Sequence, residues 1–266
     1  MDIKAIAIDL DGTLLNSKKE ITERTKEILK KVHKKGIKII ISTGRPYVSI
    51  KNLVNELEIK DMVIIYNGAK IIDLKNNEVI YEIPLEEKYV KYLIEISRKE
   101  NIHLNLYQNE EWYVENLNNE ETKKYKFLTN LIPIEKDFNT FEDYRMTKAL
   151  YVGDNLKLKK IEEILKKEIG SEVYLTFSQE FLLEILNKKV NKGSALLYVL
   201  EQYNISSEQC IAFGDAENDI EMLTSIKYGV AMKNALKKVK ESVKYQTLSN
   251  DENGVVEFIN THVNLE

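Results

Sequence analysis

The segment of residues 3–13 reads IKAIAIDLDGT. Its nearly continuous apolar run predicts a strand that is buried on both faces of a parallel sheet. Asp9 and Asp11 come at the carboxyl end of this run, where open parallel sheets bind ligands, and Gly12 lets the chain turn away. Side chains two positions apart point to the same side of an extended chain, so both carboxylates can face one bound group. The alternative interpretation is that two aspartates at a strand end only cap a turn.

The chain on either side of this segment alternates strands and helices. Apolar runs predict strands at 38–42, 62–66, 210–214 and 228–231, and apolar residues at helical spacing predict helices at 22–35, 48–57, 194–203 and 219–224. Thr22 is the expected N-cap of the first helix, and Gly36 is expected to end it. This alternation predicts an α/β fold with a Rossmann-like core built on a parallel sheet.

The pattern changes between residues 83 and 188. Longer, more polar helices are expected at 86–100, 120–131 and 156–169, and strands with alternating apolar and polar residues at 103–107, 112–115, 147–153, 173–177 and 182–186. Such alternation predicts a sheet with helices on one face and the other face open. We therefore expect an α+β cap domain, residues 83–188, inserted into a core formed by residues 1–82 and 189–266. Within the cap, Gly153-Asp154 is expected to form a turn and a helix cap.

The composition limits the possible partners and the location. The chain of 266 residues has a formal net charge of −4, so it has no excess of positive charge with which to follow a nucleic acid backbone or an anionic membrane. Cys210 is the only cysteine, and no apolar stretch approaches membrane-spanning length. The first residues also lack the basic start and the apolar segment of a signal peptide. We expect a cytoplasmic protein whose partner is a small molecule.

A second acidic segment, GDAEND at residues 214–219, follows another buried strand at its carboxyl end. If this strand and the first one are neighbours, three or four carboxylates converge. Each like-charged pair about 4 Å apart would cost roughly 4 kcal/mol at an effective dielectric near 20, so the cluster requires a cation. Oxygen ligands without a histidine or cysteine cluster favour Mg²⁺. The three histidines are scattered along the chain and are better explained as ordinary surface or half-buried residues: His33, His103 and His262.

Two further segments carry groups that suit a phosphate. Thr43 and Gly44 lie between a strand and a helix, where a hydroxyl and a backbone N–H can donate to phosphate oxygens. Lys192 stands where the chain re-enters the core and begins a helix. Each segment is a weak indication alone, and Lys192 could equally be one more solvated lysine.

Taken together, the four segments resemble the haloacid dehalogenase superfamily, and most closely its Cof-type branch, subfamily IIB with a C2B cap. Residues 9–13 are similar to the first superfamily motif, Thr43 to the second, Lys192 to the third and residues 214–219 to the fourth. Asn67-Gly68 also matches a loop common in that branch. The resemblance covers the whole chain, but in the divergent cap it implies a shape and no particular substrate.

The resemblance implies that Asp9 is the nucleophile and Asp11 the acid and base. In the expected mechanism, Mg²⁺ is bound by Asp9, by the backbone carbonyl of Asp11 and by Asp215. Phosphate oxygens are held by four residues: Thr43, Gly44, Lys192 and Asn218. Asp219 is expected to orient a metal-bound water or Lys192 rather than to bind phosphate.

The predicted function is Mg²⁺-dependent hydrolysis of a small phosphorylated metabolite through an aspartyl-phosphate. The expected substrate is a sugar phosphate or a phosphorylated cofactor such as flavin mononucleotide or pyridoxal phosphate. Three alternatives stay open: a phosphomutase-type phosphotransferase, a phospho-receiver module and a non-catalytic metabolite-binding protein. A receiver has no need of a second acid at Asp11 or of a large cap. Cap residues that could touch the substrate, or belong to the cap core, are Asn105, Tyr107, Trp112, Tyr113 and Glu115.

Overall fold

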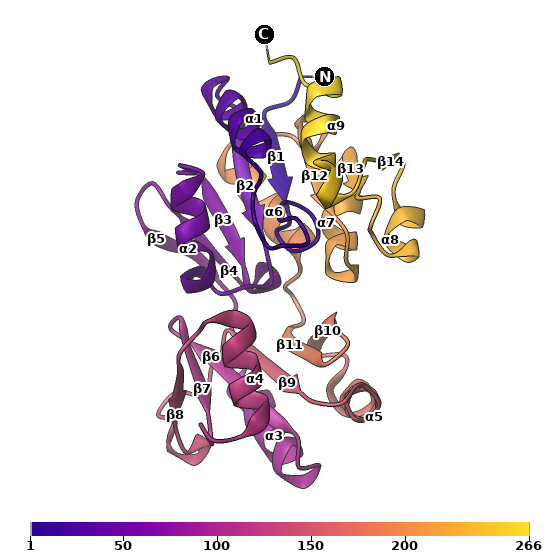
Figure 1. Ribbon diagram of the computed structural model, residues 1–266. Coiled ribbons are helices and arrows are strands. Elements are labelled where there is room, and N and C mark those ends of the chain that lie inside the picture. Colours follow the sequence, from indigo (N-terminus) through magenta and orange to yellow (C-terminus); the bar gives the residue numbers. More distant parts are fainter. Residues whose placement is uncertain (1, 266) are drawn as a thin grey trace. The chain divides into compact units, whose positions relative to one another are not determined.

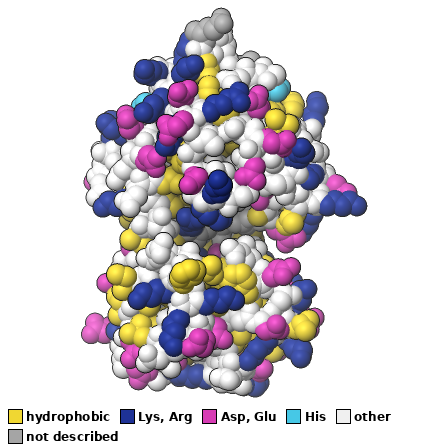
Figure 2. All heavy atoms as spheres, viewed as in Figure 1, with side chains coloured by type: hydrophobic (Ala, Val, Ile, Leu, Met, Phe, Trp, Pro, Cys, Tyr) yellow, Lys and Arg dark blue, Asp and Glu magenta, His cyan; other side chains and the backbone are white. Residues whose placement is uncertain are grey.

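The computed structural model describes residues 2–265, which form two compact units (Figure 1). The first unit comprises Met1–Gly44, Asn52–Tyr81 and Asn191–Glu266, and the second comprises Arg45–Lys51 and Glu82–Val190. The second unit thus interrupts the first between Tyr81 and Asn191, and it also takes in a short segment after Gly44. Acidic and basic side chains are interspersed over the face seen in Figure 2.

The first unit is built on an eight-stranded sheet with the order β14-β13-β12-β1-β2-β3-β4-β5. Its strands are β1 (Ala5–Ile8), β2 (Lys38–Ser42), β3 (Met62–Ile65), β4 (Lys70–Asp73), β5 (Glu78–Glu82), β12 (Cys210–Gly214), β13 (Tyr228–Ala231) and β14 (Tyr245–Gln246). From β14 to β3 every neighbouring pair is parallel, whereas β4 runs antiparallel to β3. The central strand β1 is buried throughout, as its unbroken apolar run predicts. The predicted parallel core is confirmed.

Helices accompany these strands, and the first four of them lie in the expected places. The helices are α1 (Glu23–Lys34), α2 (Tyr47–Glu56), α6 (Lys192–Gln202), α7 (Ile220–Thr224), α8 (Lys237–Ser242) and α9 (Gly254–His262), with short 3₁₀ turns that include η1 (Tyr66–Gly68) and η4 (Glu217–Asp219). α1 packs against α9, and α6 packs against α7. The hydroxyl of Thr22 caps α1 by accepting from Thr25 N, and Gly36 follows the helix with a positive φ of 76°, so both predicted ends are confirmed.

The second unit contains a six-stranded sheet with the order β10-β11-β9-β6-β7-β8. Its strands are β6 (His103–Gln108), β7 (Glu111–Val114), β8 (Pro133–Glu135), β9 (Lys148–Val152), β10 (Val173–Gln179) and β11 (Leu182–Asn187), and its helices are α3 (Glu87–Lys99), α4 (Glu120–Thr129) and α5 (Asn155–Ile169). All its ladders are antiparallel except β7–β8. Asp154 caps α5 by accepting from Leu156 N and Lys157 N, which confirms the turn and cap predicted there.

Strand alternation separates the candidate substrate residues of the cap. Leu104 and Leu106 join the hydrophobic core of this unit together with residues of α3 and α5, so Asn105 and Tyr107 point to the opposite face of β6. On that face the Tyr107 hydroxyl donates to the Tyr125 hydroxyl of α4 at 3.0 Å. Tyr113 instead packs edge-on against Phe141 beside the core, Glu115 pairs with Arg98, and Trp112 lies against the Tyr125 ring. Substrate contact by any of them stays a prediction.

Within residues 2–265, no helix combines the length and the apolar character that crossing a membrane would require.

Candidate active site

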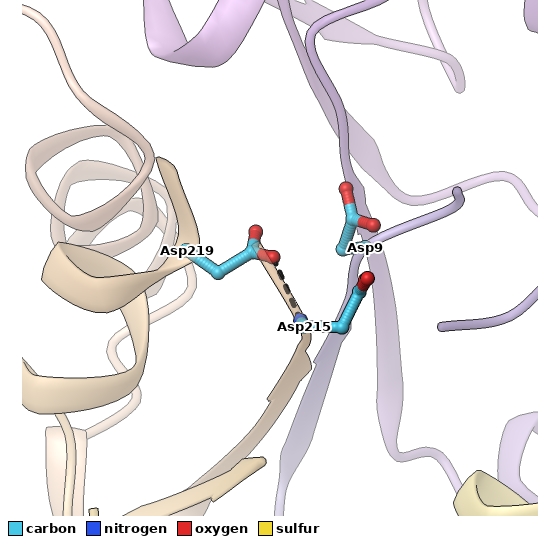
Figure 3. Close-up of side chains that lie close together, drawn as sticks. All are labelled: Asp9, Asp215 and Asp219. Carbon is cyan, nitrogen blue, oxygen red and sulfur yellow. Dashed lines mark hydrogen bonds between the residues drawn. The ribbon is translucent and has the colours of Figure 1, made fainter. Parts of the chain in front are cut away.

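The pairing of β1 with β12 places the two acidic segments side by side. Ile8 lies opposite Phe213 in a parallel register, and Asp9 N donates to Phe213 O at 3.1 Å. The carboxyl ends of β1 and β12 are therefore adjacent. The predicted cluster of carboxylates required these two strands to be neighbours. Asp9, Asp215 and Asp219 each contribute a carboxylate oxygen to a group whose members all lie within 4.8 Å of one another (Figure 3).

Lys192 links two of these carboxylates. Its Nζ lies 2.6 Å from Asp9 Oδ1 and 2.6 Å from Asp219 Oδ1, and the side chain is only 1% exposed. Lys192 is the first residue of α6. Asn191 and Ser194 form a capping box that fixes the start of this helix and thus the position of the lysine. The interpretation of Lys192 as a solvated surface lysine is therefore wrong.

Asp219 is fully buried, and both of its carboxylate oxygens are occupied. Oδ1 accepts from Lys192, while Oδ2 accepts from the backbone N–H groups of Asp215 at 2.9 Å and Ala216 at 3.0 Å. Figure 3 shows the bond to Asp215 as a dashed line. These bonds hold the turn that carries Asp215 and also hold the lysine. Such contacts suit the orienting role predicted for Asp219.

Residues of the first motif hold the Asp215 side chain in place. The Thr13 hydroxyl donates to Asp215 Oδ1 at 2.8 Å. Gly12 has a φ of 81°, and a Cβ atom there would lie 2.3 Å from Asp215 Oδ2. Glycine is thus required at position 12 both by the left-handed backbone and by the close approach of the carboxylate.

We expect Gly12→Ala to reduce the predicted phosphate-releasing activity by at least about tenfold, because the added methyl group displaces Asp215 in addition to straining the backbone by about 1–2 kcal/mol. Gly36→Ala is the matched control, since Gly36 has a φ of 76° but no atom of the described residues would lie within 4 Å of a Cβ added there. Steady-state kinetics and thermal melts of both variants separate the two effects. Equal activity losses in the two variants would show that backbone strain alone is responsible.

Burial opposes the ionisation of two carboxyl groups of this cluster, Asp9 and Asp215. The pKa of Asp9 is raised well above its usual range by burial and by the neighbouring Asp219 and Asp215, although Lys192 opposes the shift. Burial and Asp219 also raise the pKa of Asp215 to about 6. Burial by itself would lower the pKa of Lys192, but Asp219 and Asp9 raise it overall, so the lysine stays charged. One ammonium group among three carboxylates leaves the cluster with excess negative charge, and its all-oxygen donors fit a hard divalent cation.

Asp11 lies apart from this three-carboxylate group. Its carboxylate pairs with Lys19 at 2.8 Å, and its side chain is 40% exposed. The sequence did not indicate this ion pair. The predicted roles of Asp11, as acid and base and as a metal ligand through its backbone carbonyl, stay predictions.

Three of the four expected phosphate-binding residues, Thr43, Gly44 and Asn218, lie next to Asn67, a residue to which the sequence assigned no role in the site. The Asn218 side chain donates to Asn67 Oδ1 at 2.9 Å, and a Cβ atom on Gly44 would lie 2.8 Å from the same oxygen. Thr43 is buried, and its backbone carbonyl accepts from Asn67 N at 3.0 Å. The only signal for Asn67 in the sequence was its match to a loop common to the Cof-type branch.

Known proteins match the chain in both sequence and fold. The family model of haloacid dehalogenase-like hydrolases matches residues 6–259. The 5-amino-6-(5-phospho-D-ribitylamino)uracil phosphatase YcsE of Bacillus subtilis (strain 168) is 30% identical over 263 residues, which cover 97% of this chain and 95% of that protein. A haloacid dehalogenase-like hydrolase from Bacteroides thetaiotaomicron superposes with a TM-score of 0.89 at 36% identity, covering 97% of this chain and 99% of that chain. The HAD subclass IIB sugar phosphatase BT4131 superposes with a TM-score of 0.84 at 26% identity, covering 97% and 98% of the two chains.

Proposed function

Because the chain belongs to the haloacid dehalogenase-like hydrolases and is a phosphatase, we propose that it hydrolyses small phosphorylated metabolites with Mg²⁺, through an aspartyl-phosphate on Asp9. The resemblance drawn from four short motifs is thereby confirmed at the level of the family. The family and the enzyme class also argue against the receiver and the non-catalytic alternatives. The metal, the nucleophile and the substrate are the parts that we propose.

The observation that carries the choice of Asp9 among the three carboxylates is its ion pair with the buried Lys192 at the end of the central strand β1. Both oxygens of Asp219 are occupied, which argues against it as the nucleophile. Asp215, like Asp9, accepts through Oδ1 alone among residues 2–265, but its donor there is the Thr13 hydroxyl and not the Lys192 ammonium group. Asp9 accepts from Lys192 through Oδ1, and within residues 2–265 no hydrogen bond engages its Oδ2. Asp9 therefore has an oxygen available for attack on phosphorus, at the end of a rigid central strand.

The residues present can perform both halves of a hydrolysis. When bound by Asp9, Asp215 and the Asp11 carbonyl, Mg²⁺ would screen the charge of the phosphate group. Asp9 Oδ2 then forms a bond to phosphorus while the bond from phosphorus to the substrate oxygen breaks, and Asp11 protonates the departing alcohol. In the second step Asp11 takes a proton from water, whose oxygen attacks phosphorus and releases Asp9 as the carboxylate. Lys192 balances the charge on Asp9 and Asp219 throughout.

The relatives guide the proposed substrate class. One is named a sugar phosphatase, and another a phosphatase of a phosphorylated ribitylaminouracil. We extend this to a sugar phosphate, or a phosphorylated cofactor such as flavin mononucleotide or pyridoxal phosphate, as the substrate of this chain. The cytoplasmic location and the lack of a nucleic acid partner stay predictions from the sequence.

The test of this proposal is a screen of several dozen phosphorylated metabolites for release of inorganic phosphate with Mg²⁺, with the Asp9→Asn variant as the blank. Release from small phosphate monoesters by the wild-type protein alone is expected. Isomerised phospho-sugars without free phosphate would instead indicate a phosphomutase. Release that persists in the variant would exclude Asp9 as the nucleophile.

Removal of divalent metal with EDTA is expected to lower turnover by at least about a hundredfold, and added Mg²⁺ to restore it. The Mg²⁺ concentration for half-maximal activity should rise as the pH falls below about 6, because the pKa of Asp215 is about 6 and a protonated carboxyl group binds no cation. Magnesium titrations of activity on either side of this pH provide the measurement. Full activity after exhaustive chelation would rule out the proposed metal site.

A further inference from the structure

The turn η1, directly after β3, has an unusual backbone. Tyr66, Asn67 and Gly68 have φ values of 50°, 57° and 102°, so three consecutive residues adopt positive φ. All three are buried at the carboxyl end of β3. Left-handed conformations are costly for a residue as bulky as tyrosine, and they persist only where surrounding contacts enforce them. The contacts of this turn therefore indicate why the conformation is kept.

One set of contacts joins the turn to the second motif. Asn67 N donates to Thr43 O at 3.0 Å, and Thr43 N donates to Ile64 O at 2.9 Å. A Cβ atom on Gly44 would come within 2.8 Å of Asn67 Oδ1 and within 3.2 Å of Asn67 Nδ2. The backbone of residues 43–44 is thus held against the Asn67 side chain.

A second contact joins the turn to the start of α6. A Cβ atom on Gly68 would lie 2.4 Å from the backbone oxygen of Asn191, the N-cap of that helix. The next residue is Lys192, whose ammonium group reaches Asp9 and Asp219. The turn therefore sets how closely the lysine-bearing helix approaches the end of β3.

The third contact is with the amide of Asn218 in the fourth motif. Asn218 Nδ2 donates to Asn67 Oδ1 at 2.9 Å, whereas Asn218 Oδ1 is buried without a hydrogen-bond partner among residues 2–265. The bond to Asn67 is thus what orients this amide. It occupies one N–H of Asn218 and leaves the second as a donor. A rotated amide would present its carbonyl oxygen instead, which an anion would repel.

We propose that Asn67 is a positioning residue for the phosphoryl group, acting through Asn218 and through the backbone of Thr43 and Gly44. The inference rests on the proposed function, which assigns those residues and Lys192 to phosphate. Asparagine suits the position because it tolerates the left-handed backbone and offers an amide carbonyl that carries no net charge near the anion site. Aspartate would keep the acceptor but add a negative charge there.

The test uses Asn67→Gly, which removes the side chain and suits a positive φ, so that the fold is kept. Binding of inorganic phosphate with Mg²⁺ is measured by calorimetry, and KM and kcat are measured with p-nitrophenyl phosphate. We expect Asn67→Gly to weaken phosphate binding and raise KM by about three- to tenfold, the effect of one lost hydrogen bond, with a melting temperature close to that of the wild type. Asn204→Gly is the matched control: Asn204 also has a positive φ, of 53°, and its replacement should change none of these values.

Asn218→Ala and the Asn67→Gly/Asn218→Ala double variant complete a cycle. If Asn67 acts mainly through Asn218, the double variant binds phosphate about as weakly as Asn218→Ala alone. Unchanged phosphate binding in Asn67→Gly, or a wild-type protein that does not bind phosphate with Mg²⁺, would overturn the inference. Losses that multiply in the double variant would overturn the route through Asn218 and leave the backbone of Thr43 and Gly44 as the route by which Asn67 acts. The proposed function fails in a different way: phosphate binding still depends on Asn67, but Asp9→Asn hydrolyses p-nitrophenyl phosphate like the wild type.

Discussion

Replacement of Asp9 by asparagine is expected to lower turnover of p-nitrophenyl phosphate by at least about a thousandfold, because an amide cannot replace the carboxylate as the attacking group. The fold should survive, since the substitution keeps the size of the side chain and removes a buried carboxyl group whose pKa burial raises. Lys192 keeps Asp219 as its partner. Phosphate release and circular dichroism on the same preparation provide the measurement.

Asp154→Asn is the matched control for this change. Asp154 follows a glycine, as Asp215 does, but it only caps α5, and asparagine caps a helix about as well as aspartate. Activity should therefore stay at the wild-type level in this variant. Wild-type turnover in Asp9→Asn itself would eliminate Asp9 as the nucleophile.

Replacement of Lys192 by methionine is expected to have the second large effect, on both stability and activity. Removal of one partner from a buried charge cluster destabilises a protein by about 3–5 kcal/mol, here because Asp9 and Asp219 lose their shared cation. We expect turnover to fall by at least about a hundredfold, since the lysine no longer balances the attacking carboxylate. Urea unfolding and steady-state kinetics measure the two losses.

The pH dependence of the Lys192→Met stability loss has a definite sign. Lys192 lowers the pKa of Asp9, so its removal raises that pKa further above the value in the unfolded chain. An acid with a raised pKa in the folded state destabilises the protein most at high pH, where it must ionise, and this penalty shrinks as the pH falls through the folded-state pKa. The loss should therefore be larger near neutral pH than in mild acid, and Mg²⁺ should reduce it.

Lys227→Met serves as the control for this prediction. Lys227 pairs with Glu208 at the surface, where both side chains are largely exposed. Removal of such a pair changes the free energy of unfolding by at most about 1 kcal/mol. A loss in Lys192→Met no greater than that in Lys227→Met would show that the buried cluster is not held by the lysine.

Local sequence patterns were sufficient for the elements that carry a strong signal of their own. The apolar run of β1, the Thr22 cap of α1 and the Asp154 cap of α5 are each determined by a few neighbouring residues, and the structure confirms them. Weaker elements were missed: β4, β5, β8, β14, α8 and α9. β14 has only two residues, and the side chain of Asn253 makes no capping hydrogen bond at the start of α9, so neither has a clear local pattern.

Residue types at short spacing were enough to predict the α/β class, the family and the acidic and phosphate-suited residues. Which of these groups meet depends on the folded chain. Lys192 and Asp9 are 183 positions apart in the sequence. Their side chains form an ion pair because α6, which begins at Lys192, starts close to the carboxyl end of β1. The same applies to the contact of Asn67 with Asn218, which are 151 positions apart. Strand order and burial arise from the packing of the whole sheet, which no short stretch of sequence encodes.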